Sequence, residues 1–301
     1  MIVVIGSSNT DMVIKCAHLP APGETILGGS FFMNAGGKGA NQAVAAARLN
    51  GDVTFIAKVG NDVFGNQAIE LFKKENINTE CIFIDDANAS GIALITVDDK
   101  GENCIAVAQG SNGNLSVDDI KKAGRVLHDA DIILVQLEIP IATIEYIAGF
   151  AKQHNKKLIL NPAPACVLSD ELLSKISIIT PNEKEASMLA GVEINDIGSA
   201  QKAAKILSGK GIETVIITLG EEGALSYQQN IFSIIPTNKV TAIDTTAAGD
   251  VFNGALAVAV SEQKNIEDAI AFANNAASIS VTRLGAQASA PYRSEPGLIG
   301  L

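Results

Sequence analysis

Short runs of apolar residues alternate along the chain with longer segments in which apolar residues recur at helical spacing. The run Ile2–Ile5 predicts a first buried strand, whereas Lys38–Leu49 has apolar positions near i, i+3, i+4 and i+7. This alternation is typical of a mostly parallel sheet covered by helices on both faces. The further predicted strands are Val53–Val59, Ile132–Gln136, Lys157–Leu160, Ile176–Thr180 and Val215–Leu219. The further predicted helices are Val63–Glu75, Val117–His128, Ala142–His154, Glu183–Ala190 and Ala200–Ser208.

Two segments, at about 12–34 and 90–108, lack helical spacing and alternate like half-exposed strands joined by turns. The motifs LPAPGET and VDDKGEN within them are rich in the Pro, Gly and Asp that favour turns. We interpret both segments as insertions that form a small antiparallel sheet on one α/β domain spanning 1–301. Such a sheet suits a lid over the carboxyl ends of the parallel strands, where open α/β sheets bind ligands. Periodicity alone equally favours a sheet at the edge of the domain that has no role in ligand binding.

Composition narrows the class of protein. The 301 residues are 47% hydrophobic, which is enough for a large buried core, and the net charge is −11. An acidic surface repels phosphate backbones and disfavours nucleic acid as a partner. No basic leader precedes the first apolar run, and no apolar stretch is long enough to span a membrane. The four cysteines are scattered, so we expect no disulfides. Together these features predict a soluble cytoplasmic protein.

Several common catalytic motifs are missing from the sequence. It contains no Walker A motif, no G-x-G-x-x-G opening a helix after the first strand, and no G-x-S-x-G. The three histidines show no metal-binding spacing. These absences disfavour P-loop nucleotide binding, a Rossmann dinucleotide site and the commonest hydrolase chemistry.

Two polar motifs lie close to the first strand and the first long helix. GSSNTDM directly follows the strand, and Asn9 and Asp11 alternate, so both side chains point to one side of an extended chain. Such a pair suits two vicinal hydroxyls, as in a sugar, although a local Asx turn explains the motif equally well. In NAGGKGANQA the glycines leave backbone open to a ligand and Asn41 offers an amide, but a tight turn before a helix is the simpler reading.

Polar residues also recur where predicted strands end. Gln136 and Glu138 end one strand, NPAP follows the next, and TPNEKEA and TLGEEGAL follow two more. A cleft along the carboxyl edge of the sheet needs such groups. Each of them is also an ordinary helix cap or turn when taken alone.

The segment DTTAAGDVFNGAL combines two carboxylates, small residues and an apolar helix start. If the helix begins near Ala248, the backbone N–H groups of 247–250 form an anion site without any basic side chain. Asp250 in the first turn then suits a base that deprotonates a hydroxyl while a phosphoryl group rests on those N–H groups. A first-turn acid on a capped helix is the alternative.

Taken together, these motifs resemble the ribokinase family of carbohydrate kinases, also called the PfkB family. The resemblance covers essentially the whole chain, and GGKGANQAVAAARL and DTTAAGDVFNGAL are its most specific parts. It implies a three-layer α/β/α domain with a small β-sheet lid, and ATP-dependent phosphorylation of the 5-hydroxyl of D-ribose. It also implies Mg²⁺ bound with ATP, activation by a monovalent cation such as K⁺, and a homodimer formed through the lid.

The resemblance assigns roles to individual residues. It makes Asp250 the general base and places the anion hole at Ala247, Ala248 and Gly249. The residues implied for the sugar are Asn9, Asp11, Gly37, Lys38, Gly39, Ala40, Asn41, Glu138 and Asp250. Those implied for ATP are Asn182, Thr218, Leu219, Gly220, Glu221, Gly223, Gly249 and Asn274. Those implied for K⁺, several through backbone carbonyls, are Asp244, Thr246, Ser280, Arg283, Gly285 and Ser289.

Other substrates and one other function class stay open. The lid segments offer only Lys15 and Lys100 as cations, which favours a neutral sugar over a phosphorylated one. Deoxyribose, a nucleoside or a hexose are alternative substrates, and Ala35 before the glycine pair departs from many relatives. A non-enzymatic sugar-binding regulator on the same fold is disfavoured because the base and the anion hole are both present.

Overall fold

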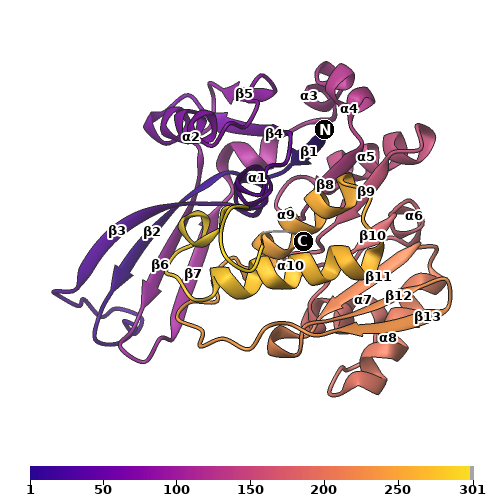
Figure 1. Ribbon diagram of the computed structural model, residues 1–301. Helices are drawn as coiled ribbons and strands as arrows, with labels where there is room; N and C mark the ends of the chain where they lie inside the picture. The colour runs from indigo at the N-terminus through magenta and orange to yellow at the C-terminus, as the bar shows by residue number, and fades with distance from the viewer. Residues whose placement is uncertain (299–301) are drawn as a thin grey trace.

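The central sheet has nine strands in the order β13-β12-β11-β10-β9-β8-β1-β4-β5 in the computed structural model, which describes residues 1–298 (Figure 1). Neighbouring strands from β11 to β5 run parallel, and β12 and β13 add an antiparallel hairpin at one edge. The strands are β1 Ile2–Ile5, β4 Val53–Gly60, β5 Ile82–Asp85, β8 Ile132–Val135, β9 Lys157–Leu160, β10 Ile178–Ile179, β11 Thr214–Thr218, β12 Ala224–Gln228 and β13 Ile231–Ile235.

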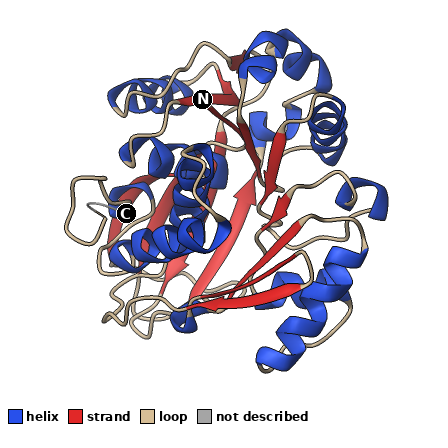
Figure 2. Ribbon diagram, turned by 45° about the vertical axis from the view of Figure 1, so that its right-hand side comes forward, coloured by secondary structure: helices blue, strands red, loops and turns tan. Residues whose placement is uncertain are grey.

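Helices cover both faces of this sheet, as Figure 2 shows. Alternate residues of β1 enter the two cores: Ile2 and Val4 pack on one side, Val3 and Ile5 on the other. The first side carries α1 Lys38–Arg48, α2 Val63–Lys74, α9 Ala248–Ser261 and α10 Ile266–Ser280. The second carries α3 Val117–Lys122, α4 Gly124–Asp129, α5 Ile141–Gln153, α6 Asp170–Leu173, α7 Glu183–Ala190 and α8 Ile197–Gly209. The predicted three-layer α/β fold is confirmed.

A second, four-stranded sheet stands beside the main one, with strand order β3-β2-β6-β7 (Figure 1). Its strands are β2 Asn9–Lys15, β3 Ser30–Gly36, β6 Gly91–Val97 and β7 Asn103–Ala108. The expectation of a purely antiparallel sheet was wrong, because β2 and β6 pair in parallel. Both of these strands leave the main domain at the same end, β2 after β1 and β6 after β5, so they run in one direction.

Several elements differ from the periodicity-based predictions. The helix expected over 117–128 is divided at Ala123, next to Gly124, a residue of low helix propensity. The strand expected over 176–180 is only two residues long. Strands β5, β12 and β13 and helix α10 had not been predicted. Ser116 and Asn182 cap α3 and α7, each within a capping box.

Two findings concern the expectations for disulfides and for membrane-spanning segments. All four cysteines are free thiols. Within residues 1–298, no helix combines the length and the apolar character needed to cross a bilayer.

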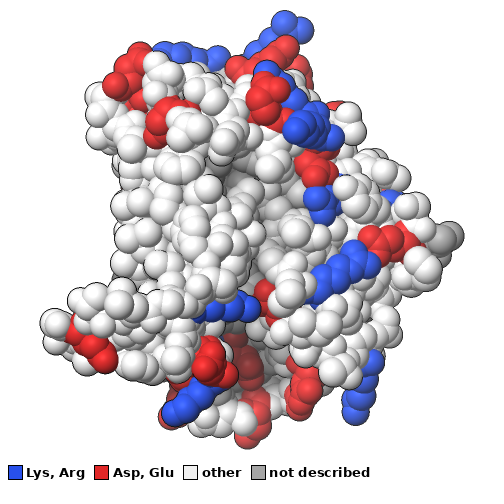
Figure 3. All heavy atoms as spheres, turned by 90° about the vertical axis from the view of Figure 1, so that its left-hand side faces the viewer, with Lys and Arg blue, Asp and Glu red and all other residues white. Residues whose placement is uncertain are grey.

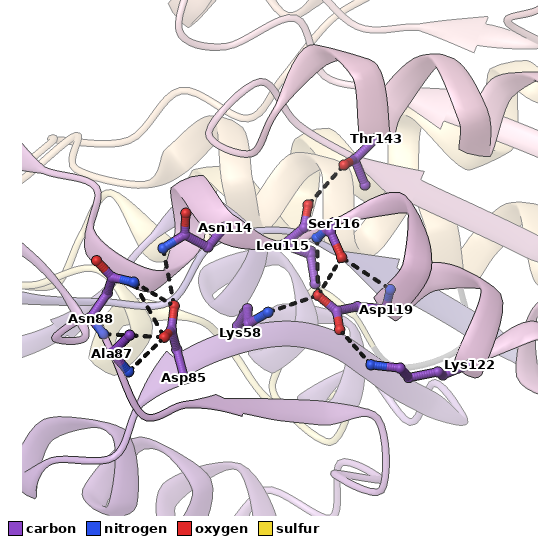
Figure 4. A network of polar contacts seen from close by, with 10 residues as sticks. All are labelled: Lys58, Asp85, Ala87, Asn88, Asn114, Leu115, Ser116, Asp119, Lys122 and Thr143. Carbon is purple, nitrogen blue, oxygen red and sulfur yellow. Dashed lines mark hydrogen bonds and ion pairs between the residues drawn. The ribbon is translucent and has the colours of Figure 1, made fainter.

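Buried carboxylates fix the base of the small sheet (Figure 4). Strand β7 returns to the main domain through the 3-10 turn Gly110–Asn114, where Asn114 donates to Asp85 at 3.0 Å. Asp119 accepts from Lys58 at 2.9 Å and from the Ser116 hydroxyl at 2.8 Å. Burial alone raises the pKa of Asp119, but these hydrogen bonds lower it to about 2. The bond from Asn114 to Asp85, the last residue of β5, ties this turn, which also carries Asn112, to the main domain.

Candidate active site

The site is organised around the start of α9. Ala247 precedes the helix in a left-handed conformation with φ of 59°, and Asp250 lies in the first turn, only 6% exposed. The N–H groups of a first helical turn lack carbonyl partners one turn earlier. Among the N–H groups of 247–250, which were expected to be available to an anion, that of Ala248 donates to the Thr245 carbonyl at 3.2 Å. An added Cβ at Gly249 meets no atom within 4 Å, so this glycine leaves open space at the helix end.

Two amides from α1 hold the Asp250 carboxylate. Asn41 Nδ2 donates to Oδ2 at 2.9 Å, and Gln42 Nε2 donates to Oδ1 at 2.9 Å. Burial raises the pKa of Asp250, and the Lys38 charge and the two amides oppose this rise. A carboxylate in this setting has the geometry and the raised basicity of a general base.

A cavity of roughly 200 Å³ opens in front of Asp250. Its wall brings together sequence positions more than 200 residues apart, all at the carboxyl ends of strands or at the starts of helices. Of the residues expected in the site, it is lined by Lys38, Asn182, Thr218, Ala247, Ala248, Gly249 and Asp250. Lining residues that had no assigned role are Asn161, Ala163, Thr180, Glu185, Thr245 and Asn253.

The carboxylates of Asp11 and Glu138 lie next to this cavity with Lys38. Glu138 accepts the Lys38 backbone N–H at 3.0 Å and the Ser7 hydroxyl. Burial, followed by repulsion from Glu138 and Asp250, raises the pKa of Asp11 to about 6, and Lys38 acts against this. Burial lowers the pKa of Lys38, but the surrounding carboxylates outweigh it and raise that pKa. The group forms an acidic pocket with a single cation, suited to a ligand rich in hydroxyl donors.

The expected sugar-binding backbone is packed tightly against β1 and β2. Gly37 has φ of 88°, and the ideal Cβ position of Gly39 lies 2.7 Å from Gly6, so both positions require glycine. The Ala40 N–H donates to the Ser7 carbonyl at 2.9 Å. Asn9 Oδ1 accepts from Asn112 Nδ2 at 2.7 Å, and the Asn9 amide nitrogen has no acceptor among residues 1–298.

The residues expected for ATP fall into two groups. Asn182 and Thr218 pair in an isolated bridge and line the cavity. Leu219 is buried, and Gly220, Glu221 and Gly223 form the turn between β11 and β12. Asn274 is set apart from the cavity wall, and its amide donates to the Ile235 carbonyl at 2.9 Å. The structure therefore gives Asn274 a role in holding the segment after β13.

The residues expected for K⁺ come together in part. Asp244 accepts the backbone N–H groups of Thr246 and Gly285, each at 2.9 Å. Partial burial raises the pKa of Asp244, but these hydrogen bonds outweigh it and lower the pKa. The hydroxyls of Ser280 and Ser289 donate to carbonyls within their own turns. The Arg283 side chain instead pairs with Glu295, so only its carbonyl is left for a cation.

Sequence reasoning missed three side chains that shape the site. Glu185 lines the cavity, and burial raises its pKa. Its signal was the capping box with Asn182, in which the Glu185 carboxylate accepts the Asn182 N–H at 2.9 Å. Gln42 and Asn253 are buried polar residues on α1 and α9, and a polar residue on an otherwise apolar helix face was the signal for both.

Comparison with known proteins places the chain among carbohydrate kinases. Residues 1–293 match the model of the pfkB family of carbohydrate kinases. A ribokinase of Haemophilus influenzae is 47% identical over 98% of this chain and 96% of its own length. A deoxyribokinase of Salmonella typhi is 36% identical, with 96% and 95% covered. A solved structure of Arabidopsis thaliana ribokinase complexed with ribose and ATP has a TM-score of 0.90 at 31% identity, with 97% and 96% covered. With a buried carboxylate at a helix start, an acidic pocket beside it and this similarity over nearly its whole length, the chain belongs to the pfkB family of carbohydrate kinases.

Proposed function

We propose that this protein transfers the γ-phosphoryl group of ATP to the 5-hydroxyl of D-ribose, giving D-ribose 5-phosphate and ADP. Asp250 takes the hydroxyl proton, the hydroxyl oxygen bonds to the γ-phosphorus, and the bond to the β,γ-bridging oxygen breaks as ADP leaves. The observation that carries this proposal is the Asp250 carboxylate, buried, held by two amides and placed at the start of α9 beside the cavity. The ribose and ATP bound to the Arabidopsis relative support the choice of both substrates.

The first turn of α9 supplies the anion hole. Ala247, Ala248 and Gly249 line the cavity, and the positive end of the helix dipole stabilises the charge on a transferring phosphoryl group. Thr245 takes one N–H of this segment in the free protein, so we assign the anion contacts chiefly to the N–H groups of Gly249 and Asp250.

The acidic pocket takes the sugar. Asp11 and Glu138 accept hydroxyl hydrogens, and the free amide nitrogen of Asn9 donates to a hydroxyl oxygen. Lys38 is the only cationic side chain among the cavity-lining residues within the described part of the chain. A second phosphate on the substrate would have no cation cluster to hold it, which supports a neutral sugar.

The turn after β11 and the cavity residues Asn182 and Thr218 take the nucleotide, with Mg²⁺ bound to its phosphates. Glu185 is the cavity carboxylate that would hold a hydrated Mg²⁺, which would offset the charge of the phosphates, because both oxygens of Asp250 already accept amide hydrogens. The oxygen-rich loop around Asp244 and Gly285 suits a monovalent cation held by carbonyl, hydroxyl and carboxylate oxygens. Free thiols and the need for ATP fit a cytoplasmic enzyme.

The test uses Asp250→Asn, which keeps the shape of the side chain but cannot take a proton. We expect turnover to fall by at least about 10³-fold while ribose and ATP still bind in calorimetry. Near-normal kcat in this variant would refute the assignment of the base. A panel of ribose, deoxyribose, nucleosides and hexoses in a coupled ADP-release assay, with and without K⁺, decides the substrate against the deoxyribokinase alternative.

The small sheet also supports a homodimer. The face of this sheet that bears Met12, Ile14, Met33, Phe31 and Leu94 is apolar, and Met33 and Leu94 are both about half exposed. Figure 3, which views the side of the molecule that carries this sheet, shows charged side chains mostly around a broad uncharged area. Large exposed apolar faces mark protein interfaces. We expect sedimentation to give a dimer and Leu94→Lys to give a monomer; a monomeric parent protein would contradict this.

A further inference from the structure

We propose that Gln42 is a positioning residue for the reaction, locked in one amide orientation so that it always donates to Asp250 Oδ1 and leaves Oδ2 to take the hydroxyl proton. This inference rests on the proposed role of Asp250 as the base. Gln42 is completely buried and does not line the cavity. It acts through Asp250 and does not touch the substrate.

All the polar atoms of the Gln42 amide are used. Nε2 donates to Asp250 Oδ1 at 2.9 Å and to Asn161 Oδ1 at 3.0 Å. Oε1 accepts from Gln136 Nε2 at 2.6 Å. An amide has two N–H hydrogens and one carbonyl oxygen, so each of its three parts has a partner.

The partners leave only one orientation for this amide. A flipped Gln42 would place its oxygen against two acceptors, Asp250 and Asn161, and its nitrogen against the donor of Gln136. Three hydrogen bonds would be replaced by repulsive contacts. An unpaired polar group in a buried site is costly, so the flipped state is excluded.

Gln136 directly follows β8 and supplies the donor to Gln42 Oε1. Gly6 leaves the space that the Gln136 side chain occupies. An ideal Cβ on Gly6 would lie 2.1 Å from Gln136 Oε1. That oxygen is buried and has no hydrogen-bond partner among residues 1–298. The unpaired Oε1 of Gln136 is a free-energy cost of this arrangement, in which the Gln136 amide nitrogen donates to Gln42. Gly6, which follows the first strand, therefore contributes to the site by making room for this side chain.

The two oxygens of Asp250 consequently face different surroundings. Oδ1 is engaged by the buried Gln42, whereas Oδ2 contacts Asn41, next to the glycine turn of 37–39. Asn41 is 7% exposed whereas Gln42 is 0% exposed, so Oδ2 lies on the more accessible side of the carboxylate. We therefore assign proton acceptance to Oδ2.

The same chain of amides reaches the anion hole. Asn161 Nδ2 donates to the Thr180 carbonyl at 3.2 Å, and the Thr180 hydroxyl donates to Asn253 Oδ1 at 2.6 Å. Asn253 Nδ2 in turn donates to the Gly249 carbonyl at 2.8 Å. One network thus ties the base to the backbone that holds the phosphoryl group.

The test compares the parent protein with Gln42→Met, which keeps the volume and removes the donor. Hydrogen bonds to a charged acceptor are strong enough that we expect the single-turnover rate at pH 7 to fall by about 10- to 100-fold. Loss of the donor favours protonated Asp250, so the acid limb of the rate profile moves up by about 1–2 pH units. The defect shrinks at high pH, and ribose and ATP affinities change by less than about threefold.

Two further variants keep the result interpretable. Thr143→Val removes a buried hydrogen bond to the Leu115 carbonyl outside the site and controls for lost stability. Gln136→Met removes the donor to Gln42 Oε1 and leaves the bonds from Gln42 to Asp250 and Asn161, so we expect an upward shift and a loss of rate that are both smaller than for Gln42→Met. This variant decides the matter if Gln42→Met does not fold.

The outcomes separate this inference from the proposed function. A Gln42→Met protein with the parent rate and pH profile would overturn the positioning role, and so would a loss of rate that is equal at every pH. An active Asp250→Asn protein would instead overturn the base itself. An inactive Asp250→Asn together with an unchanged Gln42→Met would remove only the present inference.

Discussion

Replacement of Asp11 by Asn tests whether the acidic pocket, which we propose binds the sugar, lowers the stability of the folded protein. The folded protein raises the pKa of this carboxyl from 3.8 to about 6 through burial and the nearby charges of Glu138 and Asp250. A raised carboxyl pKa means that the folded state resists ionisation, so the penalty grows as pH rises from about 4 to 6 and is constant above that. Within residues 1–298, no hydrogen bond to the Asp11 carboxylate compensates for this.

The magnitude follows from the shift. About two pKa units correspond to about 3 kcal/mol at pH 7.5, falling to about 2 kcal/mol at pH 5.5 and about 1 kcal/mol at pH 4.5. We therefore expect Asp11→Asn to raise the free energy of unfolding of the ligand-free protein by up to these amounts. Urea denaturation at the three pH values measures it, at low protein concentration because the sequence pI is about 4.8.

The same variant should bind ribose less well. An ionised acceptor is lost, so we expect the KM for ribose to rise by about 10- to 100-fold, and the parent KM to rise as pH falls below about 6. Asp118→Asn is the matched control, because Asp118 is an exposed carboxylate on α3. The reasoning is refuted if Asp11→Asn is less stable than the parent at pH 7.5, or if its advantage is the same at every pH.

Two further predictions concern the start of α9 and the chain terminus. Gly249→Ala adds a methyl group in open space at the cavity, so we expect unchanged or slightly higher stability in thermal denaturation but at least about a tenfold loss of kcat; an unchanged kcat would argue against phosphoryl contacts at this position. Arg48→Met removes a bidentate pair with Glu75 and donors to the carbonyls of Gln287 and Ala290, leaving buried partners unsatisfied. We expect a loss of about 3 kcal/mol in urea denaturation with a nearly normal KM for ribose, and a loss below about 1 kcal/mol would contradict this.

Local patterns along the sequence determined the fold class and the principal catalytic candidate. The apolar run of β1 and the helical spacing of α1 fix their types because burial imposes periods of 2 and 3.6 on strands and helices. The segment around Asp250 alone also fits an ordinary capped helix, and the resemblance of the combined motifs to the ribokinase family made this residue the principal candidate. The edge hairpin β12–β13 escaped notice, since its short alternating strands carry little local signal beside the helices around them.

The tertiary structure decided how the polar side chains are connected. Gln42, Gln136, Asn161 and Asn253 look like isolated amides in the sequence, and only the packing of α1 and α9 against the strand ends joins them to Asp250. The raised pKa of Asp11 likewise depends on burial and on carboxylates more than 100 residues away. Such effects act through space over a few ångströms, so separations along the chain do not reveal them. The sequence alone determined which functional groups the protein contains. The tertiary structure determined which of these groups contact one another.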